Sequence, residues 1–155
     1  MNAKTFLLLL TSLLVVPVSL SVVLLPASRT EAQVTVAQMD AAALLVEANR
    51  LLQQGIQQYQ ISQFREASQS WQQALELYRN PVVQAAFPQE SRLSEGNALN
   101  NLGLAYANLG QYQEAIAFYE QSLAIAGKID DHNSEIRTLL HLGLVYLQLE
   151  QYQRA

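Results

Sequence analysis

One short pattern of residues recurs three times along this chain. Gln63-Phe64-Arg65-Glu66-Ala67 returns as Gln111-Tyr112-Gln113-Glu114-Ala115, and again as Gln151-Tyr152-Gln153-Arg154-Ala155. A glycine stands twelve residues before the last alanine of each copy, at Gly55, Gly103 and Gly143. Agreement at fixed offsets in three places indicates an internal repeat, which predicts a protein built from similar structural units.

The residues around the second glycine predict an amphipathic helix. At about 100° per residue, Leu99, Leu102, Gly103 and Tyr106 fall on one face. A glycine inside a helix costs about 1 kcal/mol relative to alanine. Because the glycine recurs in every copy, we expect a neighbouring helix to approach closely there.

A second helix follows each of these first helices after a short turn. Gly110 interrupts the first helix, and Ala115, Tyr119 and Ser122 then share a face. Small residues leave room on that face and Tyr119 fills the gap between the two helices. Trp71 holds the matching position in the first copy, seven residues after Phe64. Each unit is therefore a helix pair, and successive pairs must stack to bury their apolar faces.

This pattern resembles the tetratricopeptide repeat, over about residues 40–155. The resemblance rests on the sequence Leu-Gly-x-x-Tyr, on an alanine twelve residues after the glycine, and on an aromatic residue four positions after that alanine. The resemblance implies an all-α solenoid of antiparallel helix pairs that binds other proteins and carries no catalytic site. The residues that define the repeat are Gly55, Phe64, Ala67, Trp71, Leu102, Gly103, Tyr106, Tyr112, Ala115, Tyr119, Leu142, Gly143, Tyr146, Tyr152 and Ala155.

The spacing of the glycines sets the expected boundaries. They lie 48 and 40 residues apart, whereas the standard unit has about 34. We expect a first repeat at about 40–80, an insertion at about 81–94, a second repeat at about 95–128 and a partial third at 134–155. Pro81 and Pro88 prevent one continuous helix in the insertion. Asn133 or Ser134 is the expected N-cap of the third repeat. A period near 40 resembles the long-repeat bacterial members of the family.

The resemblance also indicates where a partner would bind. The face of each first helix that lies opposite the core lines the concave groove in this family. In the second copy that stripe includes four asparagines, and asparagine is a poor helix former, which favours a functional role. The alternative is a solvated polar face. The predicted groove residues are Asn97, Asn100, Asn101, Leu104, Asn108, Arg137, His141, Leu144 and Gln148.

The chain begins with an apolar stretch that is separate from the repeats. Residues 6–25 are almost all Leu, Val, Ser and Thr behind Lys4, and the sequence turns polar after Pro26-Ala27. We interpret residues 1–32 as a secretory signal, followed by a linker at 33–39 and the array at 40–155. The alternative is an uncleaved membrane anchor, because twenty helical residues just span a bilayer core of about 30 Å.

Composition excludes several classes of function. The chain has no cysteine, which removes disulfides and thiolate chemistry. An exported protein without disulfides fits a bacterial origin better than a small secreted animal domain. Its formal net charge of −4 and the lack of a basic patch argue against nucleic acid as a partner. His141 has no nucleophile or metal ligand at a recognisable spacing, and we predict no cofactor and no metal.

The leading hypothesis is a non-catalytic scaffold, exported or tethered to a membrane through residues 6–25, that binds a protein or peptide. The alternative is the N-terminal regulatory region of a longer bacterial protein with a caspase-like protease domain. Arrays of this kind usually need three repeats, and Leu140, Leu144, Tyr146 and Leu147 would have poorly covered apolar surface. A fragment of a longer array, or self-association through the uncapped C-terminal end, would explain that surface.

Overall fold

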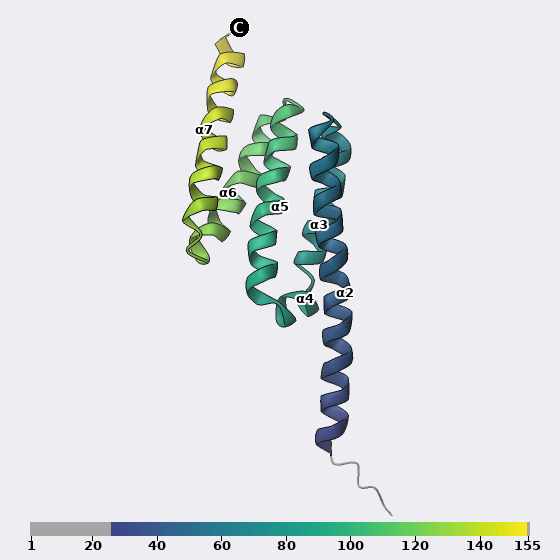
Figure 1. The fold of residues 1–155 in the computed structure, drawn as a ribbon. Helices are drawn as coiled ribbons and strands as arrows, with labels where there is room; N and C mark the ends of the chain where they lie inside the picture. Colours follow the sequence, from purple (N-terminus) through teal and green to yellow (C-terminus); the bar gives the residue numbers. More distant parts are fainter. Residues whose placement is uncertain (1–25, 155) are drawn as a thin grey trace, which may run out of the picture. The chain divides into compact units, whose positions relative to one another are not determined.

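A computed structural model describes residues 26–154, and all the regular structure in that range is helical. Residues 33–155 form one compact unit, distinct from residues 1–32. The helices are α2 (Pro26–Gln60), α3 (Phe64–Tyr78), α4 (Pro81–Ala86), α5 (Pro88–Asn108), α6 (Tyr112–Lys128) and α7 (His132–Arg154). The predicted all-helical architecture is confirmed for these residues (Figure 1). The apolar segment interpreted as a signal or anchor lies outside the described residues.

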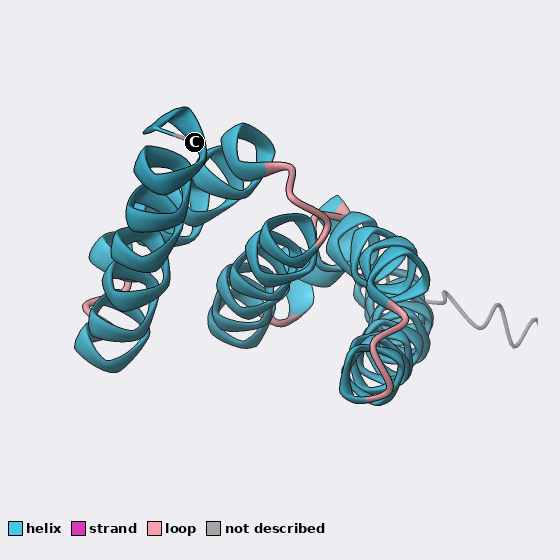
Figure 2. Cartoon of the chain, turned by 90° about the horizontal axis from the view of Figure 1, so that it is seen from above, coloured by secondary structure: helices cyan, strands magenta, loops and turns pink. Residues whose placement is uncertain are grey.

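The first two repeats are antiparallel helix pairs joined by equivalent turns. In the turn between α2 and α3, Ser62 has φ 62°, and in the turn between α5 and α6, Gly110 has φ 75°. Each turn closes with a backbone hydrogen bond of 2.9 Å, from Gln63 N to Gln58 O and from Gln111 N to Tyr106 O. Figure 2 shows these connections as short loops between neighbouring helices.

The close approach predicted at the repeated glycines is confirmed in both pairs. A Cβ atom on Gly55 would lie 2.4 Å from Nε1 of Trp71, and one on Gly103 would lie 2.5 Å from Cε1 of Tyr119. Both distances are far inside van der Waals contact. The aromatic ring of the second helix therefore lies directly on the glycine of the first helix, and any larger residue there would push the helices apart.

A continuous core joins the first helix pair to the second. It is built from buried apolar residues of α2, α3, α4 and α5, among them Trp71, Tyr78, Val83 and Leu99. The polar atoms of its aromatic residues are satisfied, because Nε1 of Trp71 donates to the Leu52 carbonyl at 3.1 Å and the Tyr78 hydroxyl bonds the Asn49 side chain at 2.7 Å. Burial raises the pKa of Tyr78 to about 12, so this hydroxyl stays neutral.

The insertion is more regular than the sequence predicted. The helix does break between Pro81 and Pro88 as expected, and each proline starts a helix at its first turn. Helix α5, however, begins at Pro88, seven residues before the expected start at 95. Val83 of the short helix α4 is completely buried in the core. The insertion is therefore part of the packed structure, and residues 33–39, expected to be a linker, belong to helix α2.

Helix α7 corrects two predictions for the third repeat. Its N-cap is Asp131 and not Asn133 or Ser134, because the Asp131 side chain accepts a hydrogen bond from Ser134 N at 3.1 Å. The helix also continues through residues 149–151, where the repeat predicts a turn. Glu150 stands in the position of Gly110, and a glutamate adopts the positive φ of that turn less readily than a glycine does, although Ser62 adopts it in the first repeat.

Much of the apolar surface of α7 is exposed in this structure. Leu140, Leu144, Tyr146 and Leu147 are all exposed, as predicted. Nothing lies within 4 Å of the place where a Cβ atom on Gly143 would be. Among residues 26–154, no helix is both long enough and apolar enough to cross a membrane. The side chains of Tyr152 and Ala155, the last two residues predicted to define the repeat, lie outside the described residues.

Candidate functional site

The predicted groove stripes of α5 and α7 lie side by side. Their members sit at equal helical intervals and differ in number by 40, so that Asn97 corresponds to Arg137 and Leu104 to Leu144. Arg137 confirms this register, because its Nη2 donates to Oδ1 of Asn97 at 2.7 Å and to the Ser134 hydroxyl at 3.1 Å. The repeat period therefore brings equivalent residues of successive pairs next to one another.

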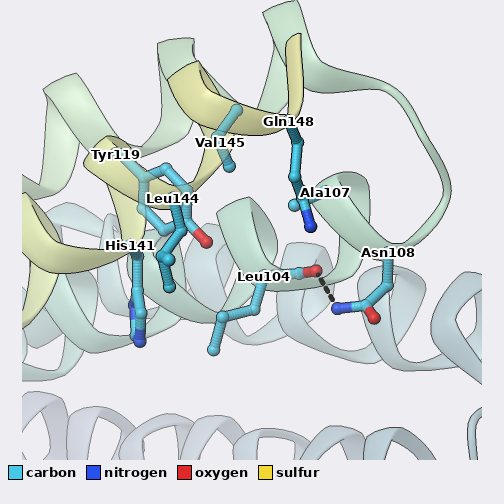
Figure 3. Close-up of a pocket in the computed structure, with 8 residues that line it drawn as sticks. All are labelled: Leu104, Ala107, Asn108, Tyr119, His141, Leu144, Val145 and Gln148. Atoms are coloured by element: carbon cyan, nitrogen blue, oxygen red, sulfur yellow. Dashed lines mark hydrogen bonds between the residues drawn. The ribbon is translucent and has the colours of Figure 1, made fainter. Parts of the chain in front are cut away.

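A cavity of about 150 Å³ opens between these stripes. It is bounded by α5 and α7, with helix α6 contributing one residue (Figure 3). Five of the predicted groove residues are among those that line it. The lining residues are Leu104, Ala107, Asn108, Tyr119, His141, Leu144, Val145 and Gln148.

The inner wall of the cavity comes from Tyr119 and Val145. Tyr119 is completely buried and Val145 nearly so. The ring of Tyr119 lies beside the imidazole of His141, with 5.7 Å between the ring centroids and 43° between the ring planes. Gly103 permits this position of Tyr119, because the ring lies where a Cβ atom would otherwise stand. The glycine that defines the repeat thus also allows the Tyr119 hydroxyl to lie at the cavity.

Two polar atoms of the cavity are buried and have no hydrogen-bond partner among the described residues. They are Oη of Tyr119 and Nδ1 of His141. Burial raises the pKa of Tyr119 well above its ordinary value, so the hydroxyl is neutral. Burial, and then the nearby Arg137 charge, lower the pKa of His141, which favours the neutral imidazole. A buried polar group without a partner is costly, so these atoms mark a place where a bound group would gain hydrogen bonds.

The outer part of the cavity combines apolar and amide side chains. The exposed fraction of Leu144 is 58%, and Gln148 is exposed on the next turn of α7. Asn108 donates through Nδ2 to the Tyr59 hydroxyl at 2.9 Å and to the Leu104 carbonyl at 2.8 Å. Asn108 thereby ties α5 to α2, and Figure 3 shows its bond to Leu104 at the cavity.

Asn100 is not a groove residue, and this prediction was wrong. Only 2% of its surface is exposed, and its Nδ2 donates to Oγ1 of Thr138 at 2.9 Å in the contact between α5 and α7. The Thr138 hydroxyl lies 3.4 Å from that of Ser122, which in turn donates to the Gly96 carbonyl at 2.9 Å. Asn100 therefore belongs to a buried polar network that joins three helices.

Two other asparagines of the stripe also contact neighbouring helices. The side-chain oxygen of Asn97 is engaged by Arg137 and the amide nitrogen of Asn108 by Tyr59. Asn101 is half-buried on α5. Asn97, Asn100 and Asn108 thus all bond neighbouring helices, and of these three only Asn108, near the C-terminal end of α5, also lines the cavity.

Sequence reasoning assigned Tyr119 a packing role and missed its hydroxyl. Trp71 occupies the same position in the first pair, and its polar nitrogen is bonded to a backbone carbonyl. The signal in the sequence is the change from Trp71 in the first copy to Tyr119 in the second, because a hydroxyl there replaces an indole nitrogen. The segment from Asp130 to Asn133 supplies the cap of α7 through the Asp131 side chain.

Comparison with known proteins agrees with the repeat found in the sequence. Residues 94–155, which include most of α5 and all of α6 and the described part of α7, match the family model described as Tetratricopeptide repeat. A search of curated proteins found no match. Repeats of this family are non-catalytic and generally mediate interactions between proteins. The match, together with the helix pairs, supports a tetratricopeptide repeat over residues 94–155.

Proposed function

We propose that this protein is a non-catalytic scaffold that binds a peptide segment of another protein along the groove between α5 and α7. One observation carries the proposal. A cavity between the two stripes brings together Leu104, Asn108, His141, Leu144 and Gln148, and two buried polar atoms at the cavity have no partner among the described residues. Sites for specific ligands combine apolar surface with a few convergent polar groups in this way.

The charge of the groove favours a partner segment without a high net charge. All eight residues that line the cavity are uncharged when His141 is neutral. Arg137, the nearest predicted groove cation, is already bonded to Asn97 and Ser134. A strongly charged segment would lose hydration at this cavity without gaining an ion pair. We infer a segment of mixed apolar and uncharged polar residues.

The place of action is part of the same proposal. The apolar run at 6–25, with Lys4 before it and a polar sequence after Ala27, is typical of a secretory signal or a membrane anchor. We propose that the helix pairs act outside the cytoplasm or at a membrane face. The intact mass of the protein in separated membrane and soluble fractions tests this, because a species that lacks the leader indicates cleavage.

A displayed library of random peptides tests the binding proposal. We expect the full chain to enrich peptides that bind in the groove, with affinity measured by fluorescence anisotropy. Leu144→Asp should weaken binding about tenfold or more, because it places a charge at an apolar contact. Val46→Asp is the matched control, since Val46 is 68% exposed on α2. Equal loss in both variants, or no enriched peptide, would overturn the proposal.

A further inference from the structure

The two unpartnered polar atoms of the cavity define the chemistry of the group that would fill it. Oη of Tyr119 and Nδ1 of His141 belong to adjacent rings, whose centroids lie 5.7 Å apart. Tyr119 is completely buried, and Figure 3 shows its hydroxyl turned toward the interior of the cavity. A tyrosine hydroxyl donates one hydrogen bond and accepts others, whereas a neutral imidazole nitrogen does one or the other according to its tautomer.

The first helix pair shows that the unpartnered hydroxyl is not a requirement of the repeat. Trp71 lies on Gly55 just as Tyr119 lies on Gly103. The Nε1 of Trp71, however, donates to the Leu52 carbonyl within its own pair. The second pair packs an aromatic ring in the same place but directs its polar atom into a cavity. At these two equivalent positions, the polar atom of the first pair is bonded and that of the second pair has no partner among the described residues.

The cavity suits an uncharged group. Its lining contains no carboxylate, ammonium or guanidinium group. Burial also lowers the pKa of His141 and so disfavours an imidazolium that could pair with an anion. A carboxylate or an amine that entered here would lose hydration without an opposite charge. The occupant must therefore use neutral hydrogen bonds.

A primary carboxamide meets these conditions best. It offers a carbonyl that accepts and an NH₂ group that donates, so it can complement Tyr119 and either tautomer of His141 together. A carboxylate can only accept. The cavity of about 150 Å³ has room for several non-hydrogen atoms, which a carboxamide side chain would fill better than a hydroxymethyl group.

We propose that this cavity is a subsite for the carboxamide side chain of a glutamine or asparagine in the partner segment. The inference rests on the proposed function, because it assigns the residue that the groove selects. The Tyr119 hydroxyl would bond the carboxamide oxygen, His141 would bond its nitrogen or oxygen according to tautomer, and Leu104 and Leu144 would contact its methylene groups.

Small probe molecules test the subsite without knowledge of the partner. The chain has two histidines, so its imidazole NMR signals report on the cavity through His141 and on an outside position through His132, whose side chain is 80% exposed. Butyramide, butyrate and 1-butanol are added separately to the full chain at millimolar concentration. We expect butyramide to shift the His141 signal saturably, with the other two probes at least about tenfold weaker, and the His132 signal to stay in place.

Two hydroxyl deletions provide the matched controls. Tyr119→Phe removes the hydroxyl at the cavity, whereas Tyr106→Phe removes one that accepts a hydrogen bond from Gln72 at 2.9 Å elsewhere on α5. Loss of an unpartnered hydroxyl should leave the fold intact, which circular dichroism checks. We expect the butyramide response to disappear in Tyr119→Phe and to persist in Tyr106→Phe.

Three outcomes would overturn the subsite. These are an equal or larger His141 shift with butyrate or 1-butanol, a response that survives Tyr119→Phe, and no shift with any probe, which would mean a cavity filled by water alone. Selected peptides that bind in the groove without a glutamine or asparagine requirement would refute the subsite while the proposed function stands. A butyramide response without any peptide binding would refute the proposed function and leave the carboxamide preference.

Discussion

At the scale of single residues, the glycine that recurs in each copy of the repeat does not have the same structural role in every copy. Gly55 and Gly103 are required because an aromatic ring occupies the space of a Cβ atom, whereas Gly143 faces open space in this structure. The sequence places all three glycines in one class. The position of the neighbouring helix distinguishes them. Packing requires Gly55 and Gly103, whereas Gly143 only lowers helix stability.

This difference predicts opposite effects for one substitution in two places. Gly103→Ala should destabilise the protein by about 1–2 kcal/mol, because overpacking outweighs the gain in helix propensity. Gly143→Ala should stabilise the 155-residue chain by up to about 1 kcal/mol. Urea unfolding of both variants measures the two changes in the free energy of unfolding. Effects of the same sign would contradict the packing that we describe.

His141 should make stability depend on pH. Its pKa is lowered in the folded protein below the ordinary value of 6.5, first by burial and then by Arg137. The unfolded chain therefore binds more protons, and stability should fall as pH drops from about 6.5 toward the folded pKa. The groups that face it are neutral Tyr119 from α6 and residues of α5 without ionisable side chains.

The two histidines allow this dependence to be isolated. His141→Gln should flatten the fall in unfolding free energy below pH 6.5, and His132→Gln, at a largely exposed position, should leave it unchanged. Unfolding free energies measured from pH 5 to 8 provide the comparison. If the pH dependence of the unfolding free energy disappeared in His132→Gln and persisted in His141→Gln, the buried imidazole would not be its source.

At the scale of elements, the caps explain why boundaries were harder to predict than helices. The pattern of apolar residues locates each helix, but the first residue depends on which side chain reaches the free backbone N–H groups. Asp131, Asn133 and Ser134 were all chemically suitable, and the positive φ of 54° at Asp130 brings Asp131 into the capping position. Similarly, Pro88 was correctly identified as a break, but the sequence did not show that it is also the first residue of α5.

The cap of α7 can be tested by two alanine substitutions. Asp131→Ala should cost about 1 kcal/mol, whereas Asn133→Ala, an exposed position inside the first turn, should be close to neutral. Hydrogen bonds from Ser134 lower the pKa of Asp131 below 3.8. This part of the stability is present above about pH 4 and is lost as pH falls through the folded pKa. Thermal unfolding at pH 7 and pH 3 measures both effects, and a larger cost for Asn133→Ala would contradict the assignment.

At the scale of the whole array, the sequence pattern shows which stripes face the same side more reliably than it shows what each side chain contacts. Residues of the α5 and α7 stripes that differ in number by 40 lie side by side, and five of the predicted groove residues line the cavity. A helical wheel gives the direction of a side chain but not the neighbour that covers it. Asn100 was therefore assigned to the groove although α7 buries it, and the Tyr119 hydroxyl was overlooked because the ring was expected only to fill the gap between two helices.

The buried polar network predicts how firmly α7 is held on α5. A double-mutant cycle between Asn100→Ala and Thr138→Val should give a coupling of about 0.5–1.5 kcal/mol in the free energy of unfolding. The hydrogen bond between Asn97 and Arg137 joins the same two helices at an exposed position. Its cycle should give a smaller value, within about 0–1 kcal/mol. A weaker coupling for the buried pair than for the exposed pair would contradict this account.

The central claim is that a partner segment binds between α5 and α7 at the cavity beside Tyr119. A ¹H–¹⁵N chemical-shift map of the full chain, titrated with a peptide enriched from the displayed library, tests it most directly. The account predicts saturable shifts that concentrate at residues 104–108 and 141–148, around the cavity, and little change in α3 and α4. Shifts confined to α2, α3 or α4, with the cavity residues unchanged, would contradict it.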